Sequence, residues 1–159
     1  MSNTATITVP HLGTSTIGYR LGKAYDASLP TLVLVNSFTA SVEQYRPQFA
    51  DERLAGVNLL AIEPYGHGET RAGYAQFTYW DSAIEILQVL DALDIPEAFV
   101  LGTSQGGWIA ARMAILAPSV VKGIIPLTST RRSRSSSTAG REAFGRGKPA
   151  VWAPASRCS

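Results

Sequence analysis

Ser104 is the residue whose setting points most directly to chemistry. It is the central residue of the pentapeptide Gly-Thr-Ser-Gln-Gly, residues 102–106, between an apolar run at 97–101 and a helical pattern at 108–114. The two glycines allow the chain to double back and hold the serine at the tip of the turn in a strained backbone conformation. Its hydroxyl then projects from the sheet, and the N–H of Gln105 points at an oxyanion formed on it. This context favours a nucleophilic serine over a serine that only caps a helix.

The elements that would position this turn are strands typical of a parallel sheet. Continuous apolar runs occupy residues 31–35, 57–62 and 121–127, as expected of strands buried on both faces. Residues 4–9 and 14–19 alternate like a β-hairpin. We expect His11, in the turn between them, to be a surface histidine.

Helices are expected between these strands. One is predicted over residues 42–54, and a second begins after a Thr78-x-x-Asp81 capping box and ends before Pro96. Strands that alternate with helices of this length indicate βαβ units. The sequence therefore predicts an α/β fold, with a mostly parallel sheet of about six strands and flanking helices.

Charge divides the chain into two parts. Residues 1–130 hold 7 basic and 11 acidic side chains, whereas residues 131–159 hold 7 basic side chains and Glu142 as their only acid. This Arg/Ser-rich segment has no hydrophobic period, so we expect it to be a disordered tail after a folded domain at 1–130. An Arg/Ser run can serve as a phosphorylation or nucleic-acid tail, but the absence of any pattern leads us to expect no nucleic-acid partner.

The remaining composition bears on the compartment. Cys158 is the single cysteine, which excludes an intrachain disulfide and favours a reducing compartment. The first 13 residues lack the basic start and the apolar stretch of a signal peptide. No apolar run approaches the ~20 residues of a membrane-spanning helix. We expect a cytoplasmic protein without a membrane partner.

Three stretches, LVLVNSFTAS, IEPYGHGET and VLGTSQGGWIAARMA, resemble the α/β-hydrolase superfamily. The resemblance covers roughly residues 4–130. It implies a serine hydrolase that acts on an ester, lactone or related acyl bond of a small molecule, without a cofactor or a metal ion. Ser104 would be the nucleophile, and the backbone N–H groups of Gln105 and Phe38 would form the oxyanion hole. Asn36 stands where the family commonly has histidine, but a backbone donor does not depend on that side chain.

After Ser104 the sequence departs from the family pattern. Family members place an Asp or Glu and then a His after the serine. Residues 105–159 contain no histidine and no aspartate, and Glu142 is their only acid. The helical cap and the last strands are missing too, as an out-of-frame or unspliced message would produce from residue 130. We assign His67 of the Gly-His-Gly turn a structural role, because the triad partners normally follow the serine. The glycines at 102–107 also lack the spacing of a dinucleotide-binding loop.

Two functions therefore stay open. One is a serine hydrolase with Ser104, Gln105 and Phe38 in the roles above. The other is a catalytically inactive fragment or a non-enzymatic binding module, because a hydroxyl without its base is a poor nucleophile. Loss of a triad member costs on the order of 10⁴–10⁶ in turnover. Residues 121–127 would also form an apolar sheet edge open to self-association.

Overall fold

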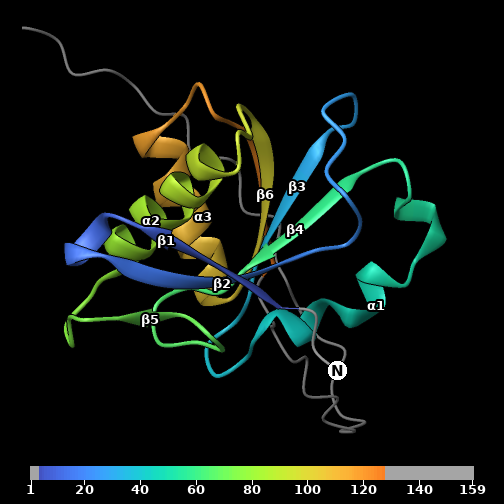
Figure 1. The fold of residues 1–159 in the computed structure, drawn as a ribbon. Coiled ribbons are helices and arrows are strands. Elements are labelled where there is room, and N and C mark those ends of the chain that lie inside the picture. Colours follow the sequence, from blue (N-terminus) through green and yellow to red (C-terminus); the bar gives the residue numbers. More distant parts are fainter. Residues whose placement is uncertain (1–3, 128–159) are drawn as a thin grey trace, which may run out of the picture.

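One mixed sheet of seven strands organises the molecule (Figure 1). The computed structural model describes residues 4–127, and the basic segment predicted at 131–159 lies outside this range. The strand order is β1-β2-β4-β3-β6-β7, and β5 pairs with β2. The strands are β1 (Ala5–Val9), β2 (Ser15–Leu21), β3 (Thr31–Val35), β4 (Asn58–Ile62), β5 (Arg71–Ala72), β6 (Ala98–Thr103) and β7 (Val121–Leu127).

The strand directions confirm the predicted fold class. β4, β3, β6 and β7 run parallel, and the β1–β2 hairpin joins them antiparallel through β2 and β4. β3 and β7 have the bounds that their apolar runs predict. β5 was not predicted, because a two-residue strand is too short to produce a pattern.

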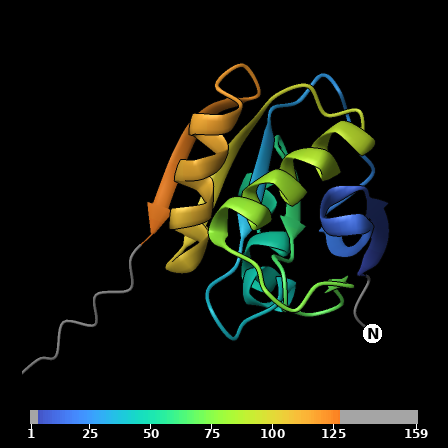
Figure 2. The same cartoon turned by 90° about the vertical axis from the view of Figure 1, so that its left-hand side faces the viewer.

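Helices α2 (Tyr79–Ala92) and α3 (Gln105–Leu116) lie side by side on one face of the sheet (Figures 1 and 2). The predicted capping box starts α2: the Thr78 N–H donates to the Asp81 carboxylate at 2.6 Å, and the Asp81 N–H donates to the Thr78 hydroxyl. Neither helix is long and apolar enough to cross a membrane, and the same holds for every other described helix.

The opposite face carries three short turns where a single helix was predicted. The segment divides into η2 (Val42–Tyr45), α1 (Arg46–Phe49) and η3 (Glu52–Leu54). Pro47 lies in the first turn of α1, where its missing N–H is tolerated, so α1 starts there instead of continuing η2. The Asp51 side chain then accepts from the Arg53 N–H and begins a new turn.

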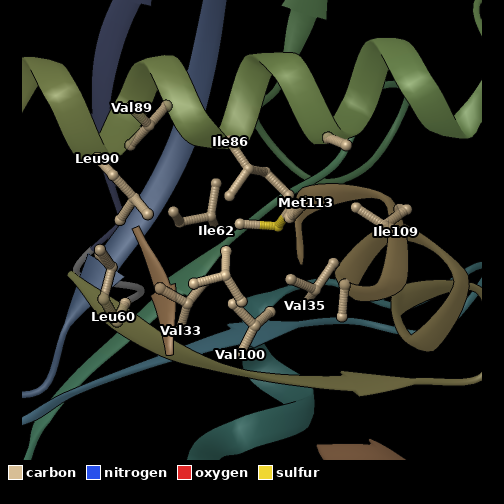
Figure 3. Close-up of a cluster of buried hydrophobic side chains, with 14 of the residues drawn as sticks. Val33, Val35, Leu60, Ile62, Ile86, Val89, Leu90, Val100, Ile109 and Met113 are labelled. Atoms are coloured by element: carbon tan, nitrogen blue, oxygen red, sulfur yellow. The ribbon is translucent and has the colours of Figure 1, made fainter. Parts of the chain in front are cut away.

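The sheet separates two apolar clusters. The larger lies beneath α2 and α3 (Figure 3), where Val33, Val35, Leu60 and Ile62 meet Met113 and other helix side chains. Alternate residues of the same strands face the other way and pack with Val42 and Tyr45. Full burial of such a side chain stabilises the fold by roughly 1.5–3 kcal/mol. The large cluster therefore holds α3, and with it the turn at Ser104, against the sheet.

His11 is not the surface histidine that its turn predicts. Its side chain is only 16% exposed, and its Nε2 lies 3.1 Å from an Asp81 carboxylate oxygen. The backbone N–H of His11 also donates to the Gln88 side chain. The η1 turn (His11–Gly13) therefore packs against α2 instead of projecting into solvent.

Candidate active site

Ser104 occupies the sharp turn between β6 and α3, with φ 53° and ψ −113°. A Cβ on Gly102 would lie 2.1 Å from the carbonyl of Gly106, and a Cβ on Gly106 would lie 2.2 Å from the Val35 oxygen. The glycine spacing is therefore a steric requirement of the turn. Ser104 is exposed, and within residues 4–127 its hydroxyl makes no hydrogen bond. The serine is held in a conformation that costs about 1–3 kcal/mol and that the fold must stabilise.

Phe38 lies in a loop that directly follows β3. The buried Asn36 side chain donates to the carbonyls of Ser37 and Ala40, at 3.0 and 2.9 Å, and the Ser37 N–H donates to Gln44. Asn36 thus holds both ends of the loop together. The amide N–H groups of Phe38 and Gln105 donate to no group in the described part of the chain. Two backbone donors are therefore unpaired among residues 4–127, one in the loop after β3 and one in the residue that follows Ser104.

His67, at the turn after β4, contacts both of these residues. Its Nδ1 lies 2.7 Å from the carbonyl oxygen of Tyr65, and its Nε2 lies 2.9 Å from the side-chain nitrogen of Gln105. A carbonyl only accepts and an amide nitrogen only donates, so Nδ1 carries the proton and Nε2 accepts. The Phe38 ring meets the imidazole edge to face, with centroids 6.0 Å apart.

These residues line an open pocket of about 460 Å³. Its lining includes the aromatic side chains of Phe38, Tyr65, Phe77 and Tyr79, and no Asp, Glu, Lys or Arg of residues 4–127 lines it. Ser104 itself is not part of the lining, but its neighbour Gln105 is. The pocket therefore offers an apolar surface next to the serine.

Tyrosines that sequence reasoning missed brace the floor of the site. The buried Tyr45 hydroxyl donates to the Val35 carbonyl at 2.7 Å and lies 3.3 Å from the Thr103 hydroxyl, so it links the ends of β3 and β6. Burial raises the pKa of Tyr45, so it remains a donor at neutral pH. Tyr65 could have been found from its place beside the Gly-His-Gly turn, because that turn follows a strand at the same sheet edge as Ser104.

Groups that could act as a base or hold a metal are scarce here. His67 uses both ring nitrogens as described, and His11 pairs with Asp81. Neither histidine is hydrogen-bonded to Ser104. Over residues 4–127, no group of three His, Cys, Asp or Glu side chains is arranged to hold a metal ion.

Comparison with known proteins identifies similar chains. The chain is 24% identical over 112 residues to a protein named putative carbamate hydrolase RutD from Stutzerimonas stutzeri, covering 70% of this chain and 42% of that one. Two solved structures, a hydrolase from Pseudomonas aeruginosa and the N-acyl homoserine lactone degrading enzyme Est816, share the fold. Their TM-scores are 0.67 and 0.65; both are 24% identical, and the match covers 77% of this chain and 44% and 45% of theirs.

The chain thus spans less than half the length of these similar proteins. A sequence model described as alpha/beta hydrolase fold matches residues 30–151, well over half of the chain. That range contains the loop at Phe38, the turn at His67 and the pentapeptide at Ser104. The chain belongs to the α/β-hydrolase fold family.

Proposed function

We propose that this site acts on the acyl bond of an ester, lactone or related compound, with Ser104 as the nucleophile. The Ser104 hydroxyl attacks the carbonyl carbon and gives its proton to water. Collapse of the resulting tetrahedral intermediate breaks the bond to the alcohol group, which leaves with a proton from water, and the remaining acyl-serine is hydrolysed by water. In the tetrahedral intermediate the carbonyl oxygen carries a negative charge. The amides of Gln105 and Phe38 stabilise this charge by donating to it. The observation that carries the proposal is the positive φ of Ser104 at the N-terminus of α3, together with the Gln105 and Phe38 amides, which have no partner among residues 4–127.

The pocket supports an uncharged group on the substrate. Its aromatic side chains offer apolar surface, and no charged side chain of the described residues lines it. Burial of a charged substrate group there would cost free energy that no partner compensates. The similar proteins include a putative carbamate hydrolase and an enzyme that degrades N-acyl homoserine lactones. Carbamates and lactones both contain a carbonyl carbon that a serine oxygen can attack.

A binding module without turnover is the second candidate. The specific observation in its favour is that both histidines of the chain are engaged away from Ser104. The acid and the histidine expected after the serine are absent from residues 105–141. Without a base the Ser104 hydroxyl stays protonated near neutral pH and attacks slowly. The two candidates differ in rate, and they share the pocket and the oxyanion hole.

Labelling with a fluorophosphonate tests the nucleophile. We expect the purified 159-residue chain to react at Ser104, because the serine oxygen displaces fluoride from the probe and the adduct resembles the tetrahedral intermediate. Ser104→Ala should not react, because it lacks this oxygen. The rate should lie on the order of 10⁴-fold below that of a complete triad. Equal labelling of the Ser104→Ala variant would refute the proposal. Rapid labelling of the wild type that His67→Ala abolishes would make His67 the base.

A further inference from the structure

We propose that His67 is a positioning residue that holds the backbone amides of Phe38 and Gln105 where both can donate to one oxyanion. This inference rests on the proposed function. The two amides belong to separate segments, one in the loop after β3 and the other at the start of α3. The His67 imidazole comes from a third segment, after β4, and contacts both: it accepts from the Gln105 side chain and packs against the Phe38 ring.

The turn that carries His67 has several supports besides the imidazole. The buried Glu63 carboxylate accepts from the backbone N–H groups of Val42 and Glu69, at 3.1 and 2.7 Å. Gly66 and Gly68 supply positive φ values of 73° and 48°, and a Cβ on Gly68 would collide with Glu63. The Thr70 N–H and the His67 N–H close the turn through backbone bonds. The ring is thus available to serve the site, since the turn has other supports.

Phe38 and Gln105, which contact the imidazole, have fewer other contacts to hold them than the His67 turn has. Phe38 is 69% exposed, and the imidazole is the only aromatic ring that it contacts within the described chain. Asn36 braces the two ends of the Phe38 loop but not its tip. The Gln105 side chain is buried, and its only hydrogen-bond partner in residues 4–127 is His67. Removal of the imidazole therefore frees the loop tip and leaves a buried amide donor without a partner.

The two nitrogens of His67 can be separated by substitution. In His67→Asn, the side-chain nitrogen replaces Nδ1 and can still donate to the Tyr65 carbonyl, but no acceptor reaches Gln105. In His67→Gln, the side-chain oxygen replaces Nε2 and can accept from Gln105. A role confined to the turn predicts that Asn is the better replacement. A role in positioning the oxyanion hole predicts that Gln is.

The experiment measures fluorophosphonate labelling of Ser104 together with the ¹⁵N–¹H spectrum of the Gln105 side-chain amide and the Phe38 and Gln105 backbone amides. We expect His67→Asn to label about tenfold more slowly, which corresponds to the loss of about one hydrogen bond, and His67→Gln to stay within about threefold of wild type. The two Gln105 resonances should move in the Asn variant and stay close to wild type in the Gln variant, whereas the Phe38 amide should move in both, because both variants lose the ring that Phe38 contacts. His11→Gln, at the other histidine, is the matched control and should change neither readout.

Coupling through Gln105 gives a second criterion. Gln105→Leu keeps the backbone N–H and removes the side-chain donor, so the double variant with His67→Asn should label no more slowly than the slower single variant. Additive losses, or equal behaviour of His67→Asn and His67→Gln in both readouts, would overturn the inference. If Ser104→Ala labels like wild type, the proposed function fails, and the amide spectra still decide whether His67 orders the two segments.

Discussion

The carboxyl edge of the sheet around Ser104 and the outer edge at β7 are built differently. At the first edge the side chains of Asn36, Tyr45 and His67 hold the loops together. At β7, which is the last strand in the sheet order, Ile124, Ile125 and Leu127 are 38%, 44% and 46% exposed. The comparison shows that residues 4–127 contain the groups that shape the site, while the apolar side chains of β7 find few partners among them.

The strained backbone of Ser104 thus lies at one edge of the sheet, whereas the exposed apolar side chains of β7 lie at another. The strained backbone of Ser104 is supported from three strands, because β3, β4 and β6 all end at this edge. Among residues 4–127, the β7 strand packs mainly with β6 and α3. We expect substitutions at the first edge to act on folding and on the site together, and substitutions at the β7 edge to act mainly on association.

The largest effect is expected from Gly106→Ala. The added Cβ would lie 2.2 Å from the Val35 carbonyl oxygen, so either α3 or β3 must move. We expect a loss above about 3 kcal/mol in the free energy of unfolding, at the upper end for overpacking, because the colliding atom belongs to the backbone. Urea titration measures it. Gly56→Ala, where an added Cβ meets nothing within 4 Å, is the control. Equal stability of the two variants would contradict a rigid turn.

Local patterns predicted local features well. The bounds of β3 and β7 followed from continuous apolar runs, and the strained backbone of Ser104 followed from its flanking glycines. The break between η2, α1 and η3 was missed, since Pro47 and Asp51 each start a new turn within a helical pattern. The contact between His67 and Gln105 joins residues 38 positions apart. It depends on how the loops after β4 and β6 meet, which no local pattern encodes.

A second prediction concerns the face of the sheet that α2 and α3 cover, where a carboxylate is buried. Glu85 on α2 is fully buried, and neither of its carboxylate oxygens has a hydrogen-bond partner in the described residues. Burial raises its pKa from 4.5 to about 9, so it is neutral in the folded state at pH 7. Between pH 4.5 and 9 the unfolded chain releases this proton and the folded chain keeps it, so stability falls as pH rises.

The expected contribution is about 3 kcal/mol between pH 4.5 and 7, at about 1.4 kcal/mol for each pH unit. Glu85→Gln should remove this slope and should be more stable than wild type at pH 8. Urea unfolding at several pH values measures the difference, with Glu52→Gln at an exposed position as the control. An unchanged slope in Glu85→Gln would show that the carboxylate finds a partner or water.

The smallest expected effect tests the β7 side of the comparison. The outer edge of β7 has no neighbouring strand within residues 4–127, so its backbone donors and acceptors are open to a second copy of the chain. Pro126 removes one donor only. We expect self-association at low micromolar concentration, and Ile125→Lys should weaken it about tenfold, or ~1.4 kcal/mol, because a charge on an edge strand opposes pairing.

Ile115→Lys distinguishes edge pairing from general hydrophobic contact. Ile115 is 68% exposed, more than Ile125, but it lies on α3 and carries no edge backbone. Sedimentation velocity over a concentration series should show weaker association for Ile125→Lys and little change for Ile115→Lys. An equal reduction by both variants would assign association to apolar surface at large. A wild-type chain that remains monomeric with a sharp thermal transition above ~60 °C would mean that the β7 edge needs no partner.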